Sequence, residues 1–199
     1  MSSRDDTMKN DAIGVFDSGM GGLTAVKELN AILPHENIIY FGDTARIPYG
    51  SRSPETVLRY AKEDVAFLRR YAVKMIIAAC GTVSSIVGDQ PFVTDMPFTG
   101  VVLPAARTAC EVTRNGRIGI IGTPATIRSG SYEKAIQKLH PEMTAFGQAC
   151  PLFVHLSGKR LYRFSQSGDT AGGRGVSGTG AESRRGYPDL GLHPLSGDP

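Results

Sequence analysis

The chain has 199 residues, 41% hydrophobic and 21% charged, which is ordinary for a soluble globular protein of one or two small domains. Its net charge is only +3 and its basic residues form no stripe, which argues against nucleic-acid binding. No apolar run approaches the roughly 18 residues that a membrane span needs, and the polar lead-in at residues 1–11 does not resemble a signal peptide. These features predict a cytoplasmic protein without membrane association.

Short apolar strands alternate with amphipathic helices along the chain, a pattern typical of α/β proteins with parallel sheets. We expect strands at residues 12–16, 37–41, 75–79, 98–102, 117–121 and 143–146. We expect helices at residues 23–33, from Ser53 as N-cap and Pro54 onward, and at 105–113 and 131–139. The long loop at 42–53 is either functional or an ordinary surface excursion.

Small polar residues follow three of the predicted strands. They are Asp17 with Ser18, Cys80 to Thr82, and Thr123 to Thr126. Open parallel sheets bind ligands just beyond the carboxyl ends of their strands, so these three strand ends are the candidate site. The glycine-rich turn at 17–22 holds neither G-x-G-x-x-G nor G-K-[ST], which disfavours a nucleotide as the ligand.

Cys80 ends the apolar strand at 75–79 and precedes a predicted helix. A thiol near a helix N-terminus is more acidic than free cysteine, whose pKa is about 8.5, and this predicts a thiolate near neutrality. The alternative is a buried structural cysteine. The other two cysteines, Cys110 and Cys150, lie far away and form no C-x-x-C pair. We therefore expect neither a disulfide framework nor a metal site.

Residues 157–199 differ in character from the rest of the chain. They hold 10 of its 24 glycines and show neither helical nor strand periodicity. Such a segment cannot bury enough surface to offset its ordering entropy. It is predicted to be disordered.

Five motifs, in order, resemble the signatures of bacterial glutamate racemase, of the aspartate/glutamate racemase family. They are GVFDSGMGGL at 14–23, YFGDTARIPYG at 40–50, ACGT at 79–82, IGTPAT at 121–126 and ACPLFV at 149–154. The resemblance covers about residues 12–156. It implies two pseudo-symmetric flavodoxin-like domains with the second half truncated: 12–97, incomplete without the family's C-terminal segment, and 98–156, partial. Residues 157–199 resemble nothing in the family.

The resemblance also implies a reaction, the cofactor-independent interconversion of L- and D-glutamate, which supplies D-glutamate for peptidoglycan. The family uses two cysteines on opposite faces of the substrate, and Cys80 matches the first. Asp17 is implied to assist the thiol, although an ionised neighbour also raises the thiol pKa. The positions that match the family's substrate contacts are Asp17, Ser18, Pro48, Tyr49, Gly50, Gly81, Thr82 and Thr123.

Two departures from the family pattern suggest that this chain is impaired. Gly81 stands where the family has asparagine, and no counterpart of the second cysteine, in its Gly-Cys-Thr-His block, occurs beyond position 160. Cys110 and Cys150 lie in the wrong context to replace it and are expected to be structural. Two alternatives stay open: a non-catalytic remnant that binds acidic amino acids or an intact subunit, and an aspartate or hydantoin racemase relative. Homodimer formation is also left open.

Overall fold

The computed structural model describes residues 11–88 and 96–151. They form a four-stranded and a two-stranded sheet, both parallel, so the predicted α/β class with parallel sheets is confirmed. The predicted disordered tail at 157–199 and nearly all of the polar lead-in lie outside the described residues. No helix in the described part of the chain is long and apolar enough to span a bilayer.

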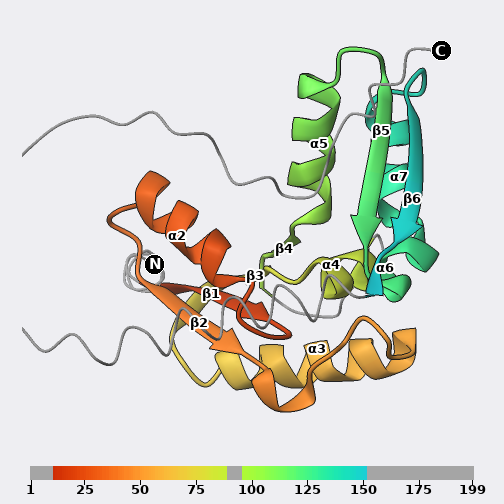
Figure 1. Cartoon of the computed structure of the whole chain (residues 1–199). Coiled ribbons are helices and arrows are strands. Elements are labelled where there is room, and N and C mark those ends of the chain that lie inside the picture. The colour runs from red at the N-terminus through yellow and green to blue at the C-terminus, as the bar shows by residue number, and fades with distance from the viewer. Residues whose placement is uncertain (1–10, 89–95, 152–199) are drawn as a thin grey trace, which may run out of the picture.

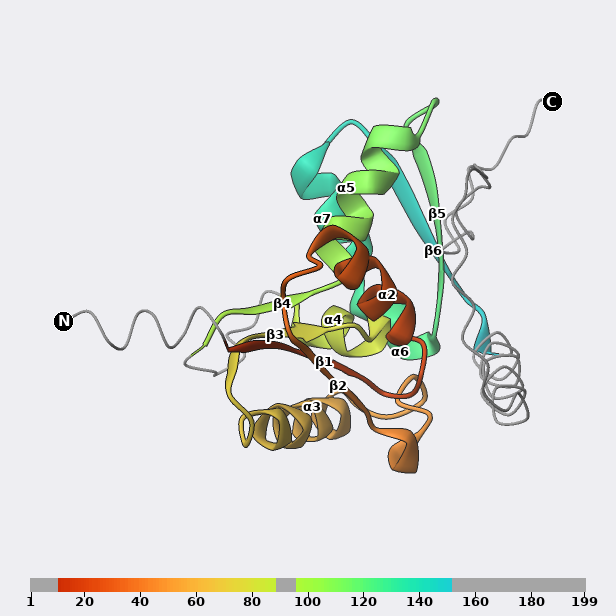
Figure 2. The same cartoon turned by 90° about the vertical axis from the view of Figure 1, so that its left-hand side faces the viewer.

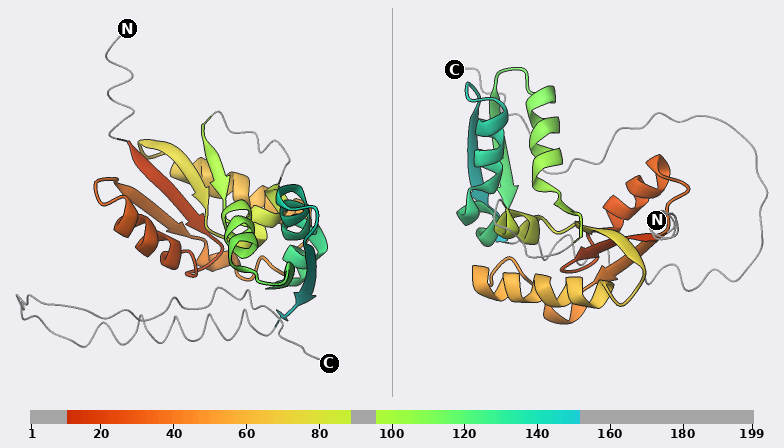
Figure 3. Two further views of the ribbon diagram at one scale, coloured as in Figure 1. Left: turned by 90° about the horizontal axis from the view of Figure 1, so that it is seen from above. Right: turned by 180° about the vertical axis from the view of Figure 1, so that it is seen from behind.

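The larger sheet has the strand order β2-β1-β3-β4, which is the order of doubly wound flavodoxin-like folds. Its strands are β1 (Ala12–Asp17), β2 (Ile38–Gly42), β3 (Val73–Ala78) and β4 (Phe98–Gly100). Every residue of β1 is buried, as expected for a central strand covered on both faces. Figure 3 shows the strands of this sheet running in one direction, so their carboxyl ends meet at one edge.

Helices cover both faces of this sheet (Figures 1 and 2). Helix α2 (Leu23–Ile32) lies on one face and α3 (Pro54–Leu68) on the other. The predicted start of α3 is confirmed, because Ser53 Oγ accepts a hydrogen bond of 3.3 Å from the Thr56 N–H. The core between α3 and the sheet includes the fully buried Phe16, Leu68 and Ile76.

A smaller unit follows β4. It contains α5 (Val102–Val112), β5 (Arg117–Gly122), α6 (Pro124–Ser129), α7 (Ser131–Leu139) and β6 (Thr144–Ala149). Helices α5 and α7 pack together on one face of the β5–β6 pair (Figure 2), around a second core that includes Ile118, Ile120 and Ile136. Helix α4 (Gly81–Val87), which follows β3, contacts α6 and α7 and so joins the two units.

Two predicted segments differ from the structure. The strand expected at 98–102 ends at Gly100, because the Val101 N–H donates to Ser84 Oγ (3.1 Å) instead of continuing the sheet ladder. This short strand pairs with β3 in the first sheet, and α5 then begins at Val102 rather than at 105. The residues Thr123 to Thr126, predicted only as polar residues that follow a strand, lie at the start of helix α6. Thr123 caps it and Pro124 opens it, the same signals that mark the start of α3.

Candidate active site

The carboxyl ends of β1 and β3 bring Ser18 and Cys80 together, although they lie 62 positions apart in the sequence. The Ala79 N–H donates to the Phe16 carbonyl (2.8 Å), which holds the two strand ends level. The Cys80 thiol donates to Ser18 Oγ at 3.3 Å and is only 4% exposed. The parallel sheet therefore places a thiol and a hydroxyl side by side, as predicted for residues that follow neighbouring parallel strands.

Asp17 is buried at the same edge and orders the glycine-rich turn. Its Oδ2 accepts a hydrogen bond of 2.9 Å from the Gly22 N–H. A side chain at position 22 would place its Cβ 2.8 Å from the Asp17 Cβ, so glycine is required for this close approach. The turn thus donates a backbone hydrogen bond to a buried carboxylate beside the thiol.

The Cys80 thiol is less acidic than its place at a helix start predicts. Burial, first, and then the negative charge of Asp17 raise its pKa to about 11, while the hydrogen bond with Ser18 acts in the opposite direction. The expectation of a thiolate near neutrality is wrong for the structure as described. The seven-residue helix α4 does not compensate for the loss of water around the charged sulfur.

Replacing Asp17 with asparagine is expected to speed the alkylation of Cys80, because loss of the neighbouring charge lowers the thiol pKa. The measurement is the rate of iodoacetamide labelling against pH, followed by mass spectrometry for each cysteine. The partly buried Cys150 is the internal control, and its rate should not change. An unchanged labelling profile of Cys80 in Asp17→Asn would show that the carboxylate does not act on the thiol.

The loop between β2 and α3 approaches this edge from the side. It contains the short 3-10 helix η1 (Thr44–Arg46) and a cis peptide bond between Ile47 and Pro48. The Tyr49 side chain is 1% exposed, and its hydroxyl contacts Asp43 and, at 3.0 Å, Asp64. With its hydroxyl engaged away from solvent, Tyr49 can offer a ligand its backbone but not its hydroxyl.

Gly50 connects this loop to the smaller unit. Its carbonyl accepts a hydrogen bond of 3.1 Å from the Ala125 N–H at the start of α6. Three threonines gather beside it: Thr82 Oγ1 lies 3.0 Å from Thr123 Oγ1, which lies 3.0 Å from Thr126 Oγ1. The structure therefore brings together Thr82 of α4 and Thr123 of the smaller unit, which are both predicted substrate contacts.

Tyr132, on α7, is a neighbour of the thiol that the sequence did not predict. Its pKa is raised by burial, first, and then by the charge of Cys80. Its hydroxyl is the atom that a Cβ at Gly81 would meet, at 3.9 Å, and the space around Gly81 is otherwise open. No motif indicates this tyrosine, because it lies on a helix of the other unit, about 50 positions along the chain.

The described residues contain no group of three or more His, Cys, Asp or Glu side chains arranged to hold a metal ion. The arrangement that they do contain is a buried thiol beside one carboxylate and several hydroxyl groups. Such a site can exchange a proton at sulfur and can donate hydrogen bonds to an anion.

Comparison with known proteins identifies the family of this chain. Residues 17–157 match the model of the Asp/Glu/Hydantoin racemase family, and the chain belongs to that family. Curated relatives of this chain include glutamate racemases. The enzyme of Geobacter metallireducens is 52% identical over 147 residues, which are 73% of this chain and 54% of the relative. The enzyme of Streptococcus gordonii is 48% identical over 150 residues, covering 75% of this chain and 57% of the relative.

Solved glutamate racemases also have this fold. The RacE1 isoform of Bacillus anthracis superposes with a TM-score of 0.73 at 40% identity, covering 79% of this chain and 60% of that one. The Francisella tularensis enzyme, solved with D-glutamate, gives a TM-score of 0.65 at 42% identity and covers 82% and 59% of the two chains. The chain therefore spans about half the length of the curated relatives that it matches.

Proposed function

We propose that this chain carries the Cys80 half of a glutamate racemase site and acts on the α-proton of D-glutamate without a cofactor. The observation that carries the proposal is the buried Cys80 thiol, hydrogen-bonded to Ser18 and next to Asp17 at the strand ends. The names of the relatives supply the substrate class, and one of them was solved with D-glutamate.

The proposed chemistry is a proton transfer at sulfur. Because the pKa of Cys80 is raised, only the small fraction of the chain in which the thiol has lost its proton to solvent can react. In that fraction the thiolate removes the α-proton, becoming a thiol, and the electron pair stays on the substrate carbon until a proton returns. The α-proton of an amino acid is a very weak acid, so the step needs a fixed geometry and donors that stabilise the developing charge. Asp17, Ser18 and the Thr82–Thr123 hydroxyl pair are the groups that we assign to hold the substrate.

The same proposal covers Pro48, Tyr49, Gly50 and Gly81 as substrate contacts, with Tyr49 acting through its backbone. A substrate carboxylate near Gly50 would lie beside the junction at which the Ala125 N–H of α6 donates to the Gly50 carbonyl. Gly81 contributes a backbone N–H but no side-chain amide, which weakens this half-site relative to a family member with asparagine there.

A single thiol works on one face of the substrate, so we propose that this chain is impaired as a racemase. Among the described residues, Cys110 is buried in the core of the smaller unit and Cys150 follows β6. Neither is assigned the second proton transfer. The supply of D-glutamate for peptidoglycan, a cytoplasmic location and a homodimer belong to the proposal for the complete enzyme. The second candidate function is a non-catalytic half that binds acidic amino acids. The cluster of threonine hydroxyl groups supports this candidate as well as the first, because hydroxyl groups can donate hydrogen bonds to carboxylates in both cases.

A ligand panel tests the substrate class. D-Glutamate should bind more tightly than D-aspartate or hydantoin in an NMR titration, and Thr123→Val should weaken the binding of D-glutamate by removing a hydroxyl of the Thr82 pair. The control is Thr113→Val, whose exposed hydroxyl contacts Asn115 and the Arg117 carbonyl on the far side of the smaller unit. A preference for D-aspartate or hydantoin would reassign the chain within its family. If D-glutamate binds Thr123→Val as tightly as Thr113→Val, the Thr82–Thr123 hydroxyl pair is not part of the site.

A further inference from the structure

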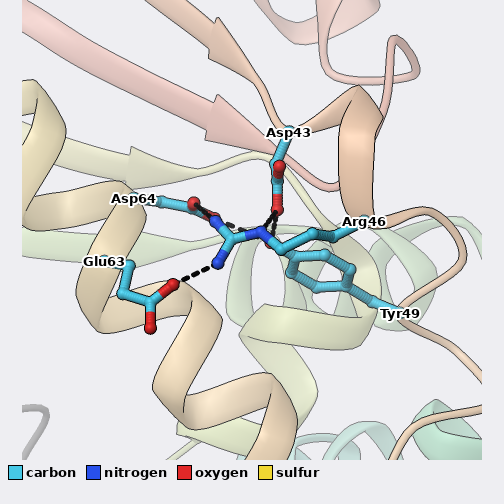
Figure 4. Close-up of polar contacts among 5 residues, drawn as sticks. All are labelled: Asp43, Arg46, Tyr49, Glu63 and Asp64. Atoms are coloured by element: carbon cyan, nitrogen blue, oxygen red, sulfur yellow. Dashed lines mark hydrogen bonds and ion pairs between the residues drawn. The ribbon is translucent and has the colours of Figure 1, made fainter.

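One arginine, Arg46, joins three carboxylates beneath the loop between β2 and α3 (Figure 4). Its Nε donates to Asp43 Oδ2 at 2.5 Å and a terminal nitrogen donates to Asp64 Oδ1 at 2.7 Å. The other terminal nitrogen contacts Glu63. The guanidinium group also lies 4.3 Å from the ring centroid of Tyr60. A planar, permanently charged group with several donors is the side chain that suits such a junction.

Tyr49 completes this cluster, which we call the Arg46 network: Asp43, Arg46, Tyr49, Glu63 and Asp64 (Figure 4). The Tyr49 hydroxyl contacts both Asp43 and Asp64, and it has only one proton to donate. Burial raises the pKa of Asp64 to about 7, while the hydrogen bond from Tyr49 and the charge of Arg46 act in the opposite direction. The two carboxylates therefore contact the same tyrosine hydroxyl group.

The network is one of three points that fix the loop. At one end the Asp43 N–H donates to the Asp17 carbonyl at 2.8 Å, next to the candidate site. At the other end the Gly50 carbonyl accepts from Ala125. Between these ends, Arg46 and Tyr49 bind Asp64 on α3. The segment 48–50 is therefore held from below by a fully buried carboxylate, while its backbone lies against the other unit.

A stabilising role alone does not account for this network. Removing charges from water is costly, and well-packed apolar residues can replace a buried ion pair without loss of stability. Directional, charge-assisted hydrogen bonds, in contrast, fix the relative orientation of the groups that they join. In the Arg46 network, Arg46 orients Asp43 and Asp64, and these two carboxylates contact the hydroxyl of Tyr49, which lies within the segment 48–50.

We propose that Arg46 and Asp64 are positioning residues, which act through Tyr49 to hold the backbone of segment 48–50 where it meets the substrate. The proposal rests on the proposed function and deepens it. Neither residue is assigned a contact with the substrate.

The test compares Asp64→Asn with Glu63→Gln. These neighbours on α3 both bind Arg46, but Asp64 is fully buried and Glu63 is 53% exposed. In Asp64→Asn, amide hydrogen exchange across 43–53 should be about tenfold faster while exchange in β1 is unchanged, and D-glutamate affinity should fall about tenfold. In Glu63→Gln, the exchange rate across 43–53 and the affinity for D-glutamate should stay within about twofold of the wild-type values, since exposed ion pairs contribute little.

Unchanged protection of 43–53 in Asp64→Asn would overturn the proposal, and so would an equal acceleration in β1, which indicates general destabilisation. If Asp64→Asn does not fold, Arg46→Gln gives the same readout, because the arginine is partly exposed and binds both Asp43 and Asp64. A wild-type chain that binds no D-glutamate contradicts the proposed function instead. The exchange contrast then still decides whether the network positions the segment.

Discussion

Replacing Cys80 with serine is expected to abolish exchange of the α-hydrogen of D-glutamate with deuterated solvent. The proposed base is the Cys80 sulfur, and a serine hydroxyl is far too weak an acid to ionise in its place. Loss of a general base lowers a rate by about 10²- to 10⁴-fold, which would bring this slow exchange below detection. Serine is close to cysteine in size, and Ser18 remains as its hydrogen-bond partner, so the fold should persist.

The measurement is the loss of the α-proton NMR signal in D₂O, with protein purified free of host racemase. Wild-type chain should show slow exchange and no net conversion by polarimetry, because one thiol returns the proton to the face from which it came. Cys150→Ser is the control, since Cys150 is partly buried and is assigned no role. Retention of exchange in Cys80→Ser would show that another group is the base. Net racemisation by the wild-type chain would reveal a second base.

The sequence predicted the elements that position this site because their apolar patterns are strong. The predicted strands at 12–16 and 75–79 lie within two residues of the observed bounds of β1 and β3, and helix α3 begins at Pro54 as predicted. A parallel sheet places the carboxyl ends of its strands at one edge, which is why the sequence alone groups Asp17, Ser18 and Cys80.

Tertiary burial explains what the sequence could not predict. The pKa of Cys80 depends on how much water the fold removes from around the sulfur, and the position of a residue at a helix start does not reveal that burial. Tyr132 senses the charge of Cys80 from a different unit, and the sequence gives no sign that Asp64 on its helix is buried. Only the packing of α3 under the loop turns Asp64 into the buried partner of Arg46.

Replacing Gly50 with alanine is expected to destabilise the chain and weaken the binding of D-glutamate together. The added Cβ would lie 2.5 Å from both the Cβ and the Cγ2 of Thr123, far inside van der Waals contact. The Thr123 Cβ is fixed to the backbone at the start of α6, so the loop and the helix must move apart. Overpacking of this kind costs about 1–3 kcal/mol. The same movement would stretch the hydrogen bond from the Ala125 N–H to the Gly50 carbonyl.

Thermal unfolding and titration with D-glutamate measure the two effects. Gly81→Ala is the matched control for stability, because a Cβ there meets only the Tyr132 hydroxyl at 3.9 Å and alanine favours a helix over glycine. Its melting temperature should equal or exceed that of the wild-type chain, while that of Gly50→Ala falls. If Gly50→Ala melts like the wild-type chain, the loop and α6 are not in the close contact described. If it melts lower but binds D-glutamate normally, the junction at Gly50 stabilises the fold without forming part of the site.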